Sequence, residues 1–124
     1  MRINLHVIVI GAGLTGSFFL KEMIAYLHMK QENLIRTDIT VFDPGSIGKE
    51  DLGAVYIRED LGQNRALLLS ELLKEQYDYE VTAVPGDFSV GSPVLQISKR
   101  DYVFMVYILI YNMDILVAVM GYIL

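Results

Sequence analysis

Near the start of the chain, residues 6–23 read HVIVIGAGLTGSFFLKEM, and this stretch decides the fold. The apolar run VIVI is followed by GAGLTG, a G-x-G-x-x-G pattern that lies between an expected buried strand and an expected helix. Gly11 allows a tight turn, Gly13 lets the backbone approach a phosphate, and Gly16 lets the helix pack closely on the sheet. The free N–H groups at the start of the helix favour an anion there. The stretch therefore predicts a nucleotide phosphate site, which NAD, FAD or ATP could occupy.

Apolar segments and turns alternate along the chain in the order of an α/β protein. Periodicity predicts strands at 5–10, 39–42, 80–84 and 102–109, and helices at 15–29 and 64–76. The first helix carries an apolar stripe made of Phe18, Phe19, Met23, Ile24 and Leu27. Strand, helix and strand in succession form a right-handed βαβ unit by default. The expected fold class is α/β, a partial Rossmann-like, doubly wound and mostly parallel sheet, with residues 1–124 as one domain that we expect to be incomplete.

Composition limits the partners and the compartment. The 124 residues carry 10 Lys and Arg against 15 Asp and Glu, which gives a net charge of -5. Contacts to nucleic-acid phosphates need clustered cations, so we expect no nucleic-acid partner. The absence of cysteine excludes disulfides, Cys-ligated zinc and a thiolate nucleophile. We therefore expect a cytoplasmic protein, and we assign no side chain as a metal ligand.

Asp43 ends the second expected strand and follows Gly13 by 30 residues. In dinucleotide-binding folds, an acidic residue at this place accepts hydrogen bonds from a ribose hydroxyl. The alternative is a turn aspartate before Pro-Gly that bonds the local backbone. Because the glycine motif precedes it, the ribose role is favoured.

Four short motifs follow one another in order: GAGLTGS at 11–17, VFDPGSI at 41–47, DLG at 51–53 and DLGQNRA at 60–66. Together they resemble the N-terminal part of the ThiF/MoeB/HesA family, the bacterial relatives of ubiquitin-activating E1 enzymes. That family shows a G-x-G-x-x-G-S turn, a strand ending D-x-D-x-V, an N-L-x-R-Q segment, and D-x-G-x-x-K-A at the start of the next helix. The resemblance covers residues 5–76.

The resemblance implies a role for five residues. Gly11, Gly13 and Gly16 match the phosphate turn, and Asp43 matches the acid that holds the ATP ribose. Arg65 stands where the family has a lysine that reaches the phosphates. The charge is kept there, although a planar guanidinium differs from a compact ammonium group.

The chain also departs from the family at charged positions. Gly45 replaces the second acid of D-x-D, and Gly53-Ala54-Val55 occupy the region of the N-L-x-R-Q arginine. The family's magnesium-holding aspartate should follow the strand that begins near Asp101, but Asp114 comes several residues too late. The arginine and the magnesium-holding aspartate are the groups that would stabilise charge during phosphoryl chemistry.

Two acidic doublets, Glu50-Asp51 and Glu59-Asp60, lie in the loop expected at 46–63. Such loop charges are usually solvated, and we expect both doublets at the surface. Arg58 is close enough to replace the missing family arginine. Beside Glu59 and Asp60, however, a solvated surface charge is the favoured interpretation.

The resemblance implies an ATP-binding, E1-like adenylyltransferase domain that activates the C-terminus of a ubiquitin-like or sulfur-carrier protein, with ATP and magnesium as cofactors. Because of the missing charged groups, we expect the 124-residue chain alone to bind nucleotide without adenylation. The alternatives are a non-catalytic nucleotide-binding or interaction fragment, and an FAD- or NAD-dependent oxidoreductase half-domain. The partners to consider are a ubiquitin-like carrier protein and a second copy of the chain.

The segment 103–124 is an atypical apolar tail, in which Asn112 and Asp114 are the only strongly polar residues. It has three interpretations. It is long enough for a membrane helix, although Asp114 disfavours insertion. It could instead form a core strand at 103–111, a turn at 112–114 and a further apolar element, which is the interpretation given most weight. The third is truncation or a frame shift of a longer chain. A membrane is therefore considered as a partner only through 103–124.

Overall fold

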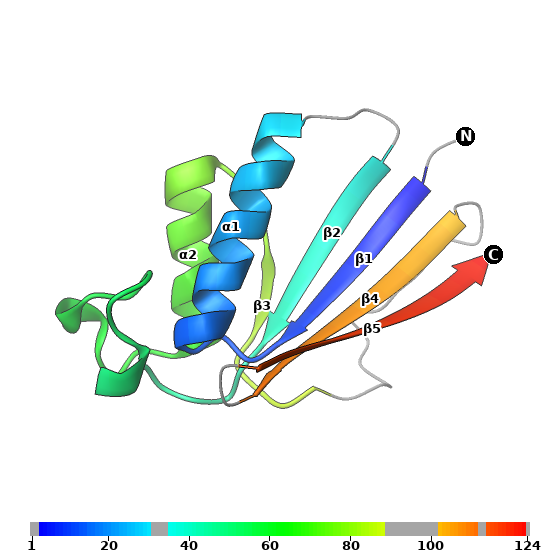
Figure 1. Ribbon diagram of the computed structural model, residues 1–124. Helices are drawn as coiled ribbons and strands as arrows, with labels where there is room; N and C mark the ends of the chain where they lie inside the picture. The colour runs from blue at the N-terminus through cyan, green and yellow to red at the C-terminus, as the bar shows by residue number, and fades with distance from the viewer. Residues whose placement is uncertain (1–2, 31–34, 89–101, 112–113, 124) are drawn as a thin grey trace.

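The computed structural model describes residues 3–30, 35–88, 102–111 and 114–123 (Figure 1). A five-stranded sheet has the order β3-β2-β1-β4-β5. Its strands are β1 (Ile3–Ile10), β2 (Ile35–Phe42), β3 (Thr82–Val84), β4 (Tyr102–Tyr111) and β5 (Asp114–Ile123). The first four are parallel, and β5 pairs antiparallel with β4. The predicted α/β class with a partial Rossmann-like sheet is confirmed.

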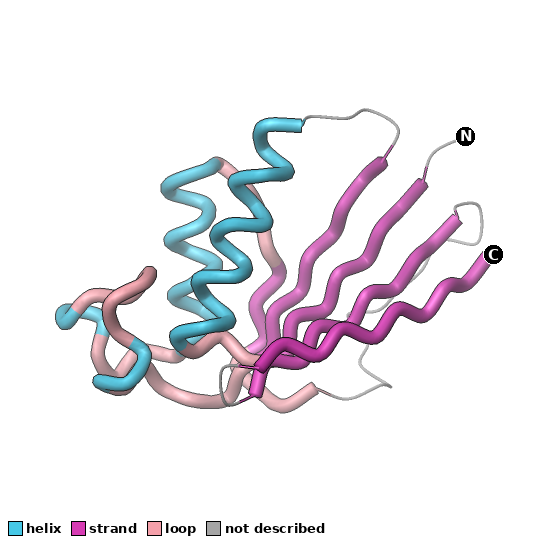
Figure 2. Tube along the Cα trace, in the orientation of Figure 1, coloured by secondary structure: helices cyan, strands magenta, loops and turns pink. Residues whose placement is uncertain are grey.

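The helices α1 (Leu14–Lys30) and α2 (Arg65–Tyr77) lie on the same side of the sheet (Figures 1 and 2). Between β2 and α2 the loop contains two single 3₁₀ turns, η1 (Lys49–Asp51) and η2 (Arg58–Asp60). Both helices match their predicted ranges to within a residue. The second strand begins earlier than predicted, because β2 pairs with β1 along its whole length, from Ile3 opposite Ile35 to Ile10 opposite Phe42.

Alternation along the strands divides the core between the two faces of the sheet. Val7, Val9, Ile39 and Val41 join the buried cluster that the helices cover, with Leu20 and Ile24 of α1 and Leu69 and Leu73 of α2. Ile8 and Phe42 form a smaller buried cluster with Ile10, Val84 and Phe88. This is the period-two pattern expected of strands covered on both faces.

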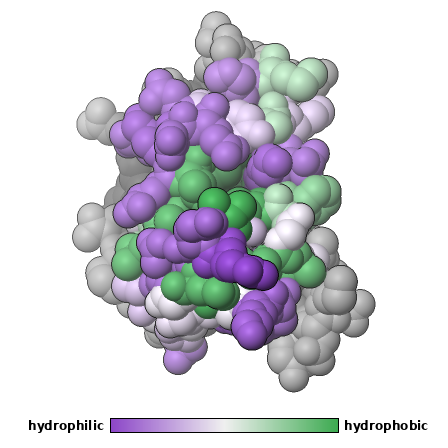
Figure 3. Space-filling model, turned by 90° about the vertical axis from the view of Figure 1, so that its left-hand side faces the viewer, coloured by the Kyte–Doolittle hydropathy of each residue, from purple (hydrophilic) through white to green (hydrophobic). Residues whose placement is uncertain are grey.

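The outer surface of the helices and loop mixes hydrophilic and apolar side chains (Figure 3). The large apolar side chains exposed there are Phe18, Tyr26, Met29, Ile57, Leu61 and Leu67. The predicted apolar stripe of α1 is therefore partly wrong. Phe18 is 51% exposed, whereas Phe19, Met23 and Leu27 pack against the core around the buried Ile24.

The apolar tail forms two strands. Its backbone follows β4 to Tyr111 and returns along β5 from Asp114, which confirms the expected strand and further apolar element. The turn predicted at 112–114 falls largely outside the described residues. None of the helices in the described part of the chain is long and apolar enough to cross a membrane.

The carboxyl ends of β1, β2 and β4 meet at one edge of the sheet, because Ile10 pairs with both Phe42 and Leu109. The glycine-rich turn after β1, the loop after β2 and the first turns of both helices gather at this edge (Figure 1). The fold thus brings the predicted site residues together.

Candidate functional site: the glycine turn and its ion-pair cluster

The turn that connects β1 to α1 has the geometry expected of the glycine motif. Gly11 has a φ of 105°, in the left-handed region that favours glycine, and its N–H donates to the carbonyl of Phe42 at 2.9 Å. The first turn of α1 closes when the Ser17 N–H donates to the Gly13 carbonyl at 2.9 Å. The N–H groups of residues 14–16 belong to those that an α-helix leaves without an intrahelical acceptor, and they suit an anion.

Asp43 joins this turn to the next one. Its Oδ2 accepts from the Ala12 N–H at 2.8 Å, and its Oδ1 accepts from the Gly45 N–H at 2.8 Å. The side chain is almost completely buried. Asp43 therefore bonds the local turn, as the turn interpretation predicts, and it also lies beside the glycine turn, as the ribose role requires. Oδ2 retains a lone pair beyond its bond to Ala12, so a ribose hydroxyl could still donate to it.

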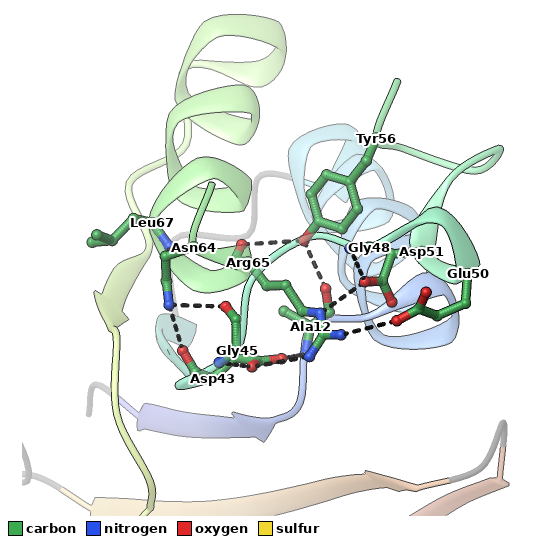
Figure 4. A network of polar contacts seen from close by, with 10 residues as sticks. All are labelled: Ala12, Asp43, Gly45, Gly48, Glu50, Asp51, Tyr56, Asn64, Arg65 and Leu67. Carbon is green, nitrogen blue, oxygen red and sulfur yellow. Dashed lines mark hydrogen bonds and ion pairs between the residues drawn. The ribbon is translucent and has the colours of Figure 1, made fainter. Parts of the chain in front are cut away.

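Arg65, the first residue of α2, lies among three carboxylates (Figure 4). Its Nε is 2.9 Å from Asp51 Oδ2, its Nη1 is 3.5 Å from Asp43 Oδ1, and its Nη2 is 3.7 Å from Glu50 Oε1. Burial alone would lower the pKa of Arg65, but the hydrogen bond to Asp51 and the charge of Asp43 outweigh it and raise that pKa. The guanidinium is therefore fully charged, and carboxylates of its own chain surround it.

Gly45 makes room for this arrangement. A Cβ atom at position 45 would overlap Nη1 of Arg65 and would lie 3.1 Å from Oδ1 of Asp43. The missing side chain at position 45 therefore leaves space for the guanidinium of Arg65.

The expectation that Asp51 is a solvated loop charge is wrong. Asp51 is 4% exposed, and its Oδ2 accepts from the Gly48 N–H at 2.9 Å as well as from Arg65. A Cβ atom at Gly13 would lie only 3.0 Å from its Oδ1, so the carboxylate touches the glycine turn. The other doublet residues Glu50 and Glu59, and Arg58, are exposed as expected.

Two uncharged side chains complete the network, and sequence reasoning assigned no role to either. The hydroxyl of Tyr56, 1% exposed, donates to the carbonyl of Ala12 at 2.7 Å and is 3.1 Å from that of Arg65. Burial first, then the charges of Asp43 and Asp51, raise the pKa of Tyr56. Tyr56 therefore stays neutral and fixes the loop to the glycine turn.

Asn64 caps α2 and anchors it to the end of β2. Its Oδ1 accepts from the Leu67 N–H at 3.0 Å, and its Nδ2 donates to the carbonyls of Asp43 and Gly45 at 3.0 and 3.1 Å. An asparagine directly before a helix is a known N-cap signal. The two bonds from Asn64 to the carbonyls of Asp43 and Gly45 depend on the tertiary fold.

The five predicted residues Gly11, Gly13, Gly16, Asp43 and Arg65 all lie at this edge of the sheet, and Gly16 is buried. The backbone of Asp114 pairs with that of Tyr111, the last residue of β4. Among the described residues, no group of three or more His, Cys, Asp or Glu could hold a metal ion.

Comparison with known proteins supports the fold. No protein-family model matches the chain, and no curated protein matches its sequence. The crystal structure of E. coli MccB with succinimide is similar, with a TM-score of 0.50 and 14% identity. The match covers 82% of this chain but 36% of MccB, so the chain spans about a third of that protein. At this identity the similarity shows that the two proteins share a fold over the matched part.

Proposed function

We propose that this chain is an E1-like domain that binds ATP at the glycine turn, residues 11–16. The observation that carries the proposal is that Asp43 bonds this turn and contacts Arg65 at the carboxyl ends of the parallel strands. In the strand order β3-β2-β1-β4, the strands that follow β1 in the sequence first extend the sheet on one side, as β2 and β3, and then on the other side, as β4, so the strand order reverses between β1 and β4. Ligands of open α/β sheets bind at the carboxyl ends of the strands at such a switch point. The glycine turn begins there.

Each group has a chemical role in this proposal. The N–H groups of residues 14–16 and the dipole of α1 receive a phosphate. Asp43 accepts a ribose hydroxyl with the lone pair of Oδ2 that Ala12 leaves unused. Arg65 turns from its carboxylates toward the phosphates. The described residues supply no set of metal ligands, so we assign none to magnesium and no step depends on it.

We further propose that this chain binds ATP without transferring its adenylyl group to a carrier protein. Gly53-Ala54-Val55 occupy the region in which the resembled family has its N-L-x-R-Q arginine. In addition, Asp43, Glu50 and Asp51 compete with a phosphate for the guanidinium of Arg65. Losing one preorganised charge-stabilising group typically lowers a rate by about a hundredfold to a thousandfold. We expect carrier-dependent exchange of labelled pyrophosphate into ATP to stay at the level of a Gly13→Val variant. Exchange clearly above that level would refute this part.

Calorimetric titration with ATP, NAD and FAD in magnesium buffer tests the site. Gly13→Val should abolish ATP binding by filling the phosphate position. Gly86→Val is the matched control, because a Cβ at position 86 meets only Val84, at 4.0 Å. For the unaltered chain, 2′,3′-dideoxy-ATP should bind about tenfold more weakly than ATP, because Asp43 loses its ribose partner. Equal ATP affinity in both glycine variants would remove the site from this turn, and binding of NAD or FAD alone would reassign the ligand.

A further inference from the structure

The carboxylate of Asp51 has the partners that a phosphate group would seek. It accepts from a backbone N–H, that of Gly48, and from the guanidinium of Arg65, both at 2.9 Å. Its Oδ1 would lie only 3.0 Å from a Cβ atom at Gly13, so it borders the space that the motif normally keeps for a phosphate. The side chain is 6% exposed, so this carboxylate is enclosed at the turn.

Two anions cannot share this place. The repulsion between a phosphate and a carboxylate at contact distance is large in a site from which water is excluded. Arg65 also cannot keep its Nε bond to Asp51 while it turns fully toward a phosphate. Entry of a phosphate at Gly13 therefore requires Asp51 to move.

We infer that Asp51 is a resident anion, which occupies the phosphate position at Gly13 and which a nucleotide polyphosphate displaces on binding. The inference rests on the proposed function, and it adds that Asp51 controls the affinity of that site for the nucleotide. Displacement transfers Arg65 from Asp51 to the phosphate. The apparent dissociation constant then equals the intrinsic one divided by the fraction of molecules in which Asp51 has left the turn.

A matched pair of variants tests the inference. Asp51→Asn removes the charge but keeps an oxygen that can accept from the Gly48 N–H. Asp60→Asn makes the same change in η2, where Oδ2 of Asp60 accepts from the Ile57 N–H at 2.8 Å. We expect calorimetry with ATP in magnesium buffer to give about a tenfold lower Kd for Asp51→Asn. The Kd of Asp60→Asn should equal that of the unaltered chain.

The outcomes separate this inference from the proposed function. If the unaltered chain binds ATP and Asp51→Asn binds it equally or more weakly, the resident-anion role is refuted and the ATP site stands. If neither chain binds ATP, both are refuted. A second measurement does not depend on folding of the Asp51 variant. The side-chain Nε–H signal of Arg65, assigned with Arg65→Lys, should shift when ATP saturates the unaltered chain, and an unchanged signal at saturation would overturn displacement.

Discussion

The turns η1 and η2 differ in their surroundings much more than in their sequence. They read Lys-Glu-Asp at 49–51 and Arg-Glu-Asp at 58–60, and extended backbone precedes each. In both, the third residue's Oδ2 accepts from the N–H of the residue before the turn, at 2.9 Å in η1 and 2.8 Å in η2. Yet Asp51 is 4% exposed and bonded to Arg65, whereas Asp60 is only partly buried.

The difference shows which properties are local and which come from the fold. A short acidic sequence specifies the turn and its internal hydrogen bond in both places. The fold brings one of the two carboxylates against Gly13 and the first residue of α2, and only that carboxylate is paired and enclosed. Paired variants at equivalent positions of the two turns can therefore separate the effect of the turn from the effect of its position.

The largest expected contrast is between the arginines. Arg65→Met leaves the carboxylates of Asp43 and Asp51 buried without their cation, and we expect a loss of about 3–5 kcal/mol in the free energy of unfolding. Arg58→Met, at an exposed residue of η2, should change it by less than about 0.5 kcal/mol. Urea denaturation at pH 7 measures both. Similar losses in the two variants would show that the cluster around Arg65 contributes nothing particular to stability.

Tyr56 lies between the two turns and bonds the loop to the glycine turn, so its hydroxyl should have a smaller but measurable effect. Tyr56→Phe leaves the buried carbonyl of Ala12 without this donor, which should cost about 1–3 kcal/mol at pH 7. An equal free energy of unfolding in the two proteins would contradict this assignment.

The same variant tests the direction of the Tyr56 pKa shift. The folded-state pKa of Tyr56 is raised above the unfolded value near 10. The stabilising contribution is therefore complete below about pH 10 and is lost as the pH rises toward the folded-state pKa. The advantage of the unaltered chain over Tyr56→Phe should shrink above about pH 10, by about 1.4 kcal/mol per pH unit. An advantage that is constant or grows over this range would show that the hydroxyl ionises as readily in the folded chain.

The smallest contrast is between the central residues of the turns. Glu50 is 3.7 Å from Arg65, but 75% of its side chain is exposed, so Glu50→Gln should cost no more than about 0.5 kcal/mol. Glu59→Gln should have no measurable effect. A large loss for Glu50→Gln would mean that the exposed carboxylate, rather than Asp51, is the main partner of Arg65.

The parts of the fold that were predictable depend on residues that are close together in the sequence. The periodic apolar patterns and the glycine turn identified the elements, and the parallel order followed from their succession. The five predicted site residues also lie together at one edge of the sheet. Their roles toward a nucleotide stay predictions.

The polar network around these residues was not predictable in the same way. Burial of Asp51 requires the loop to fold back on Gly13, and burial of Tyr56 requires the carbonyls of Ala12 and Arg65 to converge. The missing side chain at Gly45 matters only because α2 directs Arg65 toward Asp43, where a Cβ atom at position 45 would overlap the guanidinium. Each is a contact between segments far apart in the sequence, for which a periodic pattern gives no signal.

The most direct test of the central claim, that the phosphates of ATP lie at the glycine turn, is a nuclear magnetic resonance titration of ¹⁵N-labelled protein with ATP in magnesium buffer. We expect the largest shifts at the backbone amides of residues 13–16 and at the side chain of Arg65. A depression of about 500 Å³ lies elsewhere, lined by residues of α2 and β3 that include Glu71, Lys74 and Thr82. Largest shifts at those residues, with the amides of 13–16 unchanged at saturation, would contradict the claim.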